Sequence, residues 1–205
     1  MTKLKRLVRY LVHHPRVIWK FDFQQPCDVL TAYVDTDFAG CHKTRRSTNG
    51  GAFMRGNHLL YCYSTTQATV ALSSGEAELG GICKGASKGL GLQSVAADLG
   101  LQFSLDVQTD ATAAIGICRR RGLGKIRHLA VADLWIQDRL KSNDFTLTKV
   151  LGTINPADAL TKYIDRSSLE RHMRTMNLVT AEGRPEIAPS LTHAIFSQRL
   201  LPHRK

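Results

Sequence analysis

The sequence predicts an α/β fold with a mixed sheet flanked by helices. Two stretches rich in β-forming residues, GGAFMR and HLLYCYS, flank Gly56 and Asn57, a pair that suits a two-residue hairpin turn. The sheet is therefore expected to begin with antiparallel strands. Further along the chain, segments with helical and with strand periodicity alternate. A hairpin followed by such alternation is typical of a mixed sheet covered by helices.

A short helix and a strand are expected before the hairpin. Residues 4 to 12 place apolar side chains on one helical stripe, and Pro15 ends this helix. Residues 28 to 35, DVLTAYVD, are rich in β-forming residues and are predicted to form a strand. The apolar stripe of the helix consists of Leu4, Leu7, Val8, Leu11 and Val12.

A long helix is expected after the hairpin. Ser73 and Glu76 match the capping box, in which two side chains satisfy backbone N–H groups at a helix start. The helix carries glycines at positions 80, 81, 85, 89 and 91, and each costs roughly 0.5–1 kcal/mol relative to alanine. One explanation is that this helix packs very closely against the sheet. The other is that sequence drift has weakened the helix. The sequence leaves both explanations open.

The second half of the chain continues the alternation and ends in a tail. Pro156 suits the first turn of a helix in ADALTK. Beyond about residue 180 the chain has three prolines and no periodicity, which predicts a loosely attached segment. In order, the expected elements are a strand at 103–109, a short helix at 111–119, a helix from about 128 to 141, a β-like segment at 145–151, and a closing helix begun by a capping-box pattern at 165–170.

The composition favours a nucleic acid as the partner. The formal net charge is +11 and the pI about 9.7, so the molecule presents a positive field to polyanions. Ribosome-associated and membrane-surface proteins are equally basic, so charge alone does not decide. The five scattered cysteines have no CxxC spacing, which argues against a zinc site and a disulfide framework.

The sequence also predicts where the protein works. No apolar run approaches the ~18 residues of a membrane span, and no signal-peptide pattern is present. The expectation is an intracellular protein of the cytoplasm or nucleus with no membrane partner. Six Lys or Arg and no acid among the first twenty residues leave an organelle open, although the missing serines count against a transit peptide.

Four acidic residues stand where predicted strands or helices begin or end. Asp35 follows a strand, Glu78 lies in the first turns of the long helix, Asp110 follows the next strand, and Asp158 lies on the turn opened by a proline. Carboxylates at element ends can converge in a folded sheet, and a cluster of hard oxygen ligands is what Mg²⁺ or Mn²⁺ requires. The pattern therefore indicates metal-assisted phosphoryl chemistry.

Five phrases occur in an order that resembles one known family. They are YVDTDFAG, TRRSTNGGAF, VALSSGEAELGG, a TD followed by a short helix, and NPADALTK. In order and context they resemble the ribonuclease H domain of copia-type LTR retrotransposon polyproteins, from about Leu4 to about Leu178. The resemblance implies the ribonuclease H-like form of the mixed sheet. It also implies three parts: a remnant of the upstream reverse transcriptase or connection helix at 1–24, a ribonuclease H-like domain at 25–178, and a loosely structured tail at 179–205.

The resemblance implies an endonuclease that cleaves the RNA strand of RNA–DNA hybrids, joined in the parent polyprotein to an upstream reverse transcriptase. Hydrolysis would use two Mg²⁺ or Mn²⁺ ions about 3.5–4 Å apart and no small-molecule cofactor. Asp35 would bridge both ions, Glu78 and Asp110 would complete one shell, and Asp158 would help the other. Because like charges repel, at least one carboxyl should keep its proton until metal binds.

Two of the acids have close neighbours that must be told apart from them. Glu76 has a structural role in the capping box, whereas Glu78 in AELGG matches the glutamate that the family carries on this helix. In the same way Asp35 follows the AYV strand, as the first aspartate of the family does, and Asp37 begins the loop. Asp35 and Glu78 are therefore the preferred candidates.

Basic residues are candidates for contact with phosphates, a role that needs positive charge and no base readout. A solvated loop is the alternative for all of them. Recognition of a hybrid also needs contacts to 2′-hydroxyls, for which Asn49, Gln67, Ser73 and Ser74 are suitable. Many ribonucleases H carry a histidine just before the fourth acid, and VLGTINPAD has none. The candidates for phosphate contact are Arg45, Arg46, Arg119, Arg120, Arg121, Lys125, Arg127 and His128, the last of which is equally well explained as a surface or packed histidine.

Two other functions stay open at this point. A domesticated or decayed copy could keep the fold as a nucleic-acid-binding or scaffold module without turnover, and the glycine-rich helix favours it. An integrase or resolvase of the same superfamily is disfavoured, because a hairpin directly after the first aspartate and a glutamate on the first core helix follow the ribonuclease H order.

Overall fold

The computed structural model describes residues 2–122 and 134–183. Among the described residues, the backbone divides into two compact units, one within 19–179 and the other made of residues 2–18 and 180–183. The start of the helix expected near residue 128 and most of the expected tail lie outside the described residues. The domain boundaries expected from the sequence stay a prediction.

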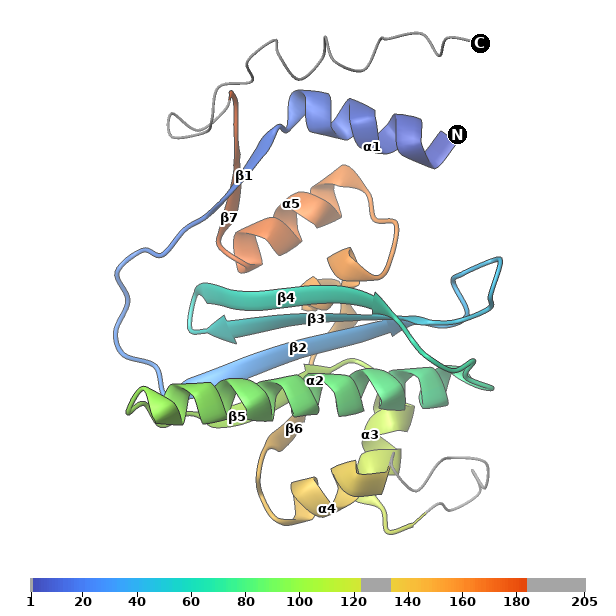
Figure 1. Cartoon of the computed structure of the whole chain (residues 1–205), viewed down its shortest axis with the longest axis vertical. Helices are drawn as coiled ribbons and strands as arrows, with labels where there is room; N and C mark the ends of the chain where they lie inside the picture. The colour runs from blue at the N-terminus through green and yellow to red at the C-terminus, as the bar shows by residue number, and fades with distance from the viewer. Residues whose placement is uncertain (1, 123–133, 184–205) are drawn as a thin grey trace, which may run out of the picture. The chain divides into compact units, whose positions relative to one another are not determined.

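The larger unit is built on a five-stranded sheet in the order β4-β3-β2-β5-β6 (Figure 1). β2 pairs antiparallel with β3, and β3 with β4, whereas β5 lies parallel to both β2 and β6. This arrangement confirms the predicted α/β fold, in which antiparallel hairpin strands and parallel strands share one sheet flanked by helices. The strands are β2 (Val29–Asp37), β3 (Thr48–Arg55), β4 (His58–Thr66), β5 (Ser104–Thr109) and β6 (Thr146–Lys149).

The long helix α2 (Ser74–Asp98) lies along the sheet and contacts β2, β3 and β5 (Figure 1). Its start is capped as the sequence predicts. The backbone N–H of Glu76 donates to the Ser73 hydroxyl at 3.2 Å, and the Glu76 carboxylate accepts from the backbone N–H of Leu72 at 2.8 Å. The first bond satisfies one of the donors that every helix start leaves unpaired, and the second holds the residue before the cap, where the capping box would bond the N–H of Ser73 itself.

Close packing explains the glycines of α2. A Cβ built on Gly85 would collide with the Val34 side chain of β2, so at this position the helix can approach the sheet only without a side chain. Gly91, by contrast, is exposed, and a Cβ there would meet nothing within 4 Å. The glycines on the sheet side of α2 therefore have a packing role, and drift of the sequence is not needed to explain them.

The two faces of the sheet carry separate apolar clusters. The larger one joins the sheet to α2, α3 (Thr112–Arg119) and α4 (Trp135–Lys141), with Phe53 of β3 fully buried in it. The neighbours of Phe53 point to the opposite face, because side chains alternate along a strand. There Ala52 and Met54 pack with Leu59 and Met176.

The opposite face is covered by the segment that follows β6. This segment contains two short 3-10 helices, η2 (Gly152–Ile154) and η3 (Pro156–Leu160), and then α5 (Arg166–Thr175). The cap of α5 differs from the expected pattern: Asp165 accepts from the backbone N–H of Ser168 at 2.9 Å, and Glu170 instead forms an ion pair with Arg166 at 2.7 Å. His172 of α5 is buried, a position that the sequence analysis did not identify.

The smaller unit contains the N-terminal helix α1 (Thr2–His13). The five side chains of its predicted apolar stripe are each 49–69% exposed. The short strands β1 (Arg16–Trp19) and β7 (Leu178–Ala181) pair with each other in a separate two-stranded sheet. Among the described residues, no helix combines the length and the apolar character needed to cross a bilayer.

Candidate metal centre

Three of the four predicted acids meet at one edge of the sheet. Asp35 is near the end of β2 and Asp110 directly follows β5. β2 and β5 are parallel neighbours whose register pairs Tyr33 with Gln108, so the two aspartates, each two residues further on, reach the same edge. The carboxyl ends of parallel strands lie at the same edge of a sheet, so the residues that follow them meet there. Ligands of α/β folds bind at this edge.

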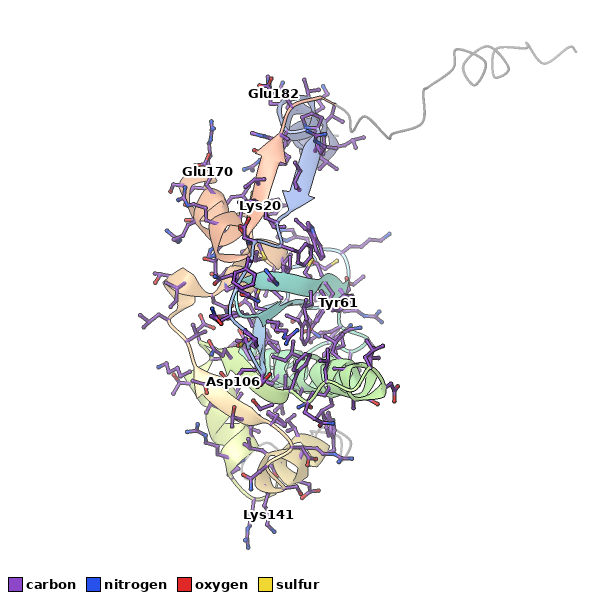
Figure 2. The ribbon with its side chains drawn as sticks, turned by 90° about the vertical axis from the view of Figure 1, so that its left-hand side faces the viewer. Lys20, Tyr61, Asp106, Lys141, Glu170 and Glu182 are labelled. Atoms are coloured by element: carbon purple, nitrogen blue, oxygen red, sulfur yellow. The ribbon has the colours of Figure 1, made fainter. Side chains whose placement is uncertain are left out.

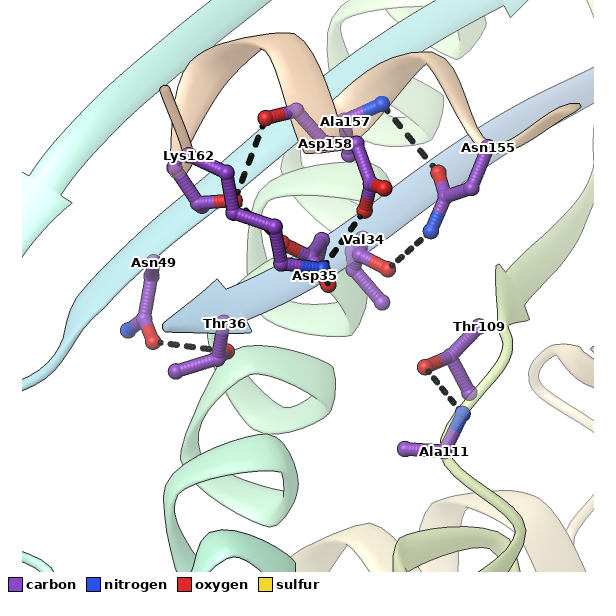
Figure 3. A network of polar contacts seen from close by, with 11 residues as sticks. Val34, Asp35, Thr36, Asn49, Thr109, Ala111, Asn155, Ala157, Asp158 and Lys162 are labelled. Carbon is purple, nitrogen blue, oxygen red and sulfur yellow. Dashed lines mark hydrogen bonds and ion pairs between the residues drawn. The ribbon is translucent and has the colours of Figure 1, made fainter. Parts of the chain in front are cut away.

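Asp158 reaches the same place from a segment far away in the sequence. It lies in η3, and Asn155 fixes the start of η3 over β2. The buried Asn155 side chain donates to the carbonyl of Val34 at 3.0 Å and accepts from the backbone N–H of Ala157 at 3.1 Å (Figure 3). Val34 immediately precedes Asp35, so one amide side chain places Asp158 next to the first aspartate.

A glycine in β3 permits this approach. Gly50 pairs with Asp35 across the antiparallel ladder. A Cβ on Gly50 would lie 3.0 Å from the carbonyl oxygen of Ala157 and 2.7 Å from the methyl group of Thr161. The 3-10 segment can therefore lie on the sheet beside Asp35 only because position 50 has no side chain.

The three aspartates together offer a cluster of oxygen ligands. Asp35, Asp110 and Asp158 each contribute a carboxylate oxygen, and these three atoms lie within 4.8 Å of one another. Asp35 is only 1% exposed. Hard oxygens at this spacing suit Mg²⁺ or Mn²⁺, and the cluster contains no sulfur or imidazole that would favour a softer metal.

Glu78 lies beside the three aspartates but is not one of the group within 4.8 Å. Burial raises the pKa of Glu78 to about 8, and the negative charges of Asp35 and Asp110 add to the effect. Asp158 contributes less, and Lys162 acts in the opposite direction. The carboxyl of Glu78 therefore keeps its proton at neutral pH in the metal-free protein.

The backbone confines Asp110 from the side of η2. A Cβ on Gly152 would come within 2.6 Å of the Asp110 Oδ2 atom, so the chain passes directly against this carboxylate. The hydroxyl of Thr109 accepts from the backbone N–H of Ala111 at 3.3 Å, which holds the turn that carries Asp110. The position of Asp110 therefore depends on a glycine that the sequence analysis did not select.

Two further residues of the same segment contact the acids, and the sequence analysis gave neither a role. The Lys162 ammonium lies 3.1 Å from Asp35 Oδ1 and 2.9 Å from Asp158 Oδ1 (Figure 3). The Thr161 hydroxyl donates to the other oxygen of Asp35. The spacing of four residues between Asp158 and Lys162 is the one signal in the sequence for this pair.

The charges of this group affect one another. Burial raises the pKa of Asp158, the charge of Asp35 raises it further, and the hydrogen bond from Lys162 opposes both. Burial alone would lower the pKa of Lys162, but the hydrogen bond to Asp158 and the charge of Asp35 outweigh it, so the pKa is raised. Lys162 therefore remains a cation throughout the neutral range.

The rejected neighbours have structural contacts. Asp37 accepts a hydrogen bond from the backbone N–H of Thr48, which closes the start of the β2–β3 pair. Glu76 caps α2, as described above. Neither residue is in the three-aspartate group.

Five of the predicted phosphate contacts are described, two in the loop between β2 and β3 and three at and just after the end of α3. Arg45 and Arg46 are exposed in the loop between β2 and β3. Arg119, Arg120 and Arg121 line an open cavity of about 720 Å³ beside α4 and β6, and Arg119 also donates to the carbonyl of Leu147 at 2.8 Å. Three further candidates, Lys125, Arg127 and His128, lie outside the described residues.

Two of the residues proposed to contact 2′-hydroxyls, Asn49 and Gln67, are hydrogen-bonded to each other. Gln67 donates to Asn49 at 2.7 Å and to the carbonyl of Ala77 at 2.8 Å, and Thr36 donates to the same Asn49 oxygen at 3.1 Å. Asn49 and Gln67 line a cavity of about 310 Å³ beside the start of α2. Ser73 is occupied as the cap of α2.

Comparison with known proteins places this site in context. No protein-family model matches the chain. The chain is 29% identical over 144 residues to the retrovirus-related Pol polyprotein from transposon TNT 1-94 of Nicotiana tabacum, a match that covers 69% of this chain and 11% of that protein. It is 27% identical over 195 residues to the Pol polyprotein from transposon RE1 of Arabidopsis thaliana, covering 93% of this chain and 13% of that protein.

The chain spans only about an eighth of the length of these relatives. Among solved structures, LC11-RNase H1, isolated from compost, shows 12% identity and a TM-score of 0.46, covering 65% of this chain and 93% of that one. The two sequence matches carry the conclusion: this chain is similar to one segment of the retrovirus-related Pol polyproteins of copia-type transposons, which confirms the resemblance seen in its motifs.

Proposed function

We propose that this chain is a ribonuclease H-type endonuclease that cleaves the RNA strand of RNA–DNA hybrids with the help of two Mg²⁺ or Mn²⁺ ions. The observation that carries the proposal is the convergence of three carboxylate oxygens within 4.8 Å, with Glu78 beside them. The acids come from four separate segments of the chain. Burying such charges together is costly unless cations compensate them, so a site of this kind is expected to serve binding.

Asp35, Asp110 and Asp158 would hold the ions, and Glu78 would join them. Bound divalent ions stabilise negative charge on a phosphodiester and lower the pKa of a bound water. Glu78 holds a proton in the metal-free protein and gives it up on ligation, because only the carboxylate form is a ligand. Metal affinity should therefore fall as the pH drops below about 8.

The basic loops would hold the substrate. Arg45 and Arg46 are exposed and Arg121 lies beside the cavity next to α4, so all three are available for phosphates. Each phosphate contact contributes roughly 0.7–0.9 to the slope of log binding constant against log salt concentration. Replacing the three arginines with serine should flatten that slope for hybrid binding, and an unchanged slope would remove them from the interface.

The proposed activity can be tested with a labelled RNA–DNA hybrid in Mg²⁺. Wild type is compared with Asp110→Asn and with Asp98→Asn, which makes the same change at an exposed position at the end of α2. Loss of an outer-shell partner already costs 10–100-fold in metal sites, so loss of a ligand should reduce cleavage by at least about a hundredfold. Asp98→Asn should cleave as wild type does.

One observation favours a second candidate, a module that binds nucleic acid without turnover. The ammonium of Lys162 lies between two of the acids and compensates part of their charge within the chain itself. A wild-type protein that binds the hybrid but leaves it intact in Mg²⁺ and in Mn²⁺ would establish this candidate and exclude the nuclease.

A further inference from the structure

Lys162 lies where a cation shared by two carboxylates would lie. Its Nζ atom is 2.9 Å from Asp158 Oδ1 and 3.1 Å from Asp35 Oδ1. Asp35 and Lys162 are 127 residues apart in the sequence, so the contact is a product of the fold. Figure 3 shows the lysine side chain reaching over the sheet to a point between the two acids.

The contact involves two of the carboxylates that the proposed metal ligation needs. Oδ1 of Asp35 accepts from Lys162 and Oδ2 accepts from the Thr161 hydroxyl, so both oxygens of this buried carboxylate already have a donor. Oδ1 of Asp158 is also bound to Lys162. A second cation placed between Oδ1 of Asp35 and Oδ1 of Asp158 would have to replace the ammonium.

The lysine can leave without disrupting the fold. Its side chain is 42% exposed, whereas Asp35 is almost completely enclosed. A lysine carries its charge on a flexible four-carbon stem and is strongly hydrated, so the ammonium can be transferred from the acids to water.

We propose that Lys162 is a displaceable internal counter-ion, which competes with a divalent ion for the position between Asp35 and Asp158. This inference rests on the proposed function, because it concerns the same site. The ammonium keeps the two carboxylates together in the metal-free protein and weakens metal binding there. A divalent ion carries twice the charge and replaces it at sufficient concentration, after which Lys162 faces solvent beside the site.

The test is titration calorimetry of Mn²⁺ into the whole chain without nucleic acid. Wild type is compared with Lys162→Met, which keeps an unbranched stem and removes the charge, and with Lys141→Met, a matched control. Lys141 is exposed at the end of α4 and points away from the fold (Figure 2). The weaker Mn²⁺ binding event should tighten by roughly tenfold in Lys162→Met, about 1.4 kcal/mol, and should not change in Lys141→Met.

The outcomes separate this inference from the proposed function. If Asp110→Asn abolishes Mn²⁺ binding but Lys162→Met binds no more tightly than wild type, the counter-ion role is wrong and the metal site stands. If neither wild type nor Lys162→Met binds Mn²⁺ although both are folded by circular dichroism, both proposals fail.

A second measurement on the wild-type protein covers the case in which Lys162→Met does not fold. Lysines are acylated briefly with and without saturating Mg²⁺, and the modification of each is quantified by mass spectrometry. Displacement predicts that Mg²⁺ increases the labelling of Lys162 several-fold while that of Lys141 stays constant. Equal labelling of Lys162 in both conditions would overturn the inference.

Discussion

The substitution Glu78→Gln should stabilise the metal-free protein, and increasingly so as the pH rises. Burial and the neighbouring aspartates raise the pKa of Glu78 from its ordinary value of 4.5 to about 8. The folded state therefore retains a proton that the unfolded chain releases. The free energy of unfolding should therefore decline as the pH rises from about 4.5. The contribution of the Glu78 proton to it should be completely lost above about pH 8.

The size of the effect follows from the two pKa values. At ~1.36 kcal/mol for each pKa unit, the difference between 4.5 and about 8 corresponds to an upper bound of about 5 kcal/mol. Solvent reaches part of the side chain and the structure can relax, so we expect about 2–3 kcal/mol. Glutamine has nearly the same shape and no charge, so it should avoid this penalty at every pH.

The measurement is urea unfolding of wild type and Glu78→Gln in EDTA at pH 5 and pH 9. The control is Glu76→Gln, the same change two residues earlier, where glutamine can still cap α2. The free energy of unfolding of Glu78→Gln, relative to wild type, should rise by about 2 kcal/mol from pH 5 to pH 9. The corresponding difference for Glu76→Gln should stay the same.

Saturating Mg²⁺ adds a second readout. It should reverse the order of stability, because wild type gains a full ligand set that Glu78→Gln lacks. An advantage of equal size at pH 5 and pH 9 in EDTA would refute the reasoning, since it would show that the charge of Glu78 is not destabilising in the folded state.

Three further predictions concern packing and pH. Gly85→Ala should destabilise the protein by roughly 1–3 kcal/mol because α2 would be pushed off the sheet, whereas Gly91→Ala should stabilise it by roughly 0.5–1 kcal/mol, both measured by urea unfolding. Gly152→Ala should weaken Mn²⁺ binding in calorimetry by displacing the adjacent aspartate, whereas Gly116→Ala, a change into open space on α3, should leave it unchanged. Burial lowers the pKa of His172, so the neutral imidazole contributes its whole stabilisation above about pH 6.5. Thermal stability should decline as the pH falls below that value, and His172→Met should not show this decline.

Local signals in the sequence determined most of the elements, whereas the choice of acids also used the resemblance of their motifs to the ribonuclease H family. The Gly56-Asn57 turn predicts the hairpin of β3 and β4, and the Ser73–Glu76 pair predicts the start of α2, because both depend on residues a few positions apart. The preference for Glu78 over Glu76 combined this capping signal with the match of Glu78 to the glutamate that the family carries on the same helix. The spacing from Ser73 identifies Glu76 as a capping residue, which leaves Glu78 available for the site.

Only the tertiary structure decided how the site is assembled and what neutralises it. The glycines of α2 look like a weakness along the chain, and their packing role appears only when Val34 is placed opposite Gly85. The hydrogen bond from Asn155 to Val34 spans 121 residues and the ion pair from Lys162 to Asp35 spans 127. No periodicity or turn signal records contacts at such separations, because they arise when strand pairing and the return of the chain across the sheet bring distant segments together.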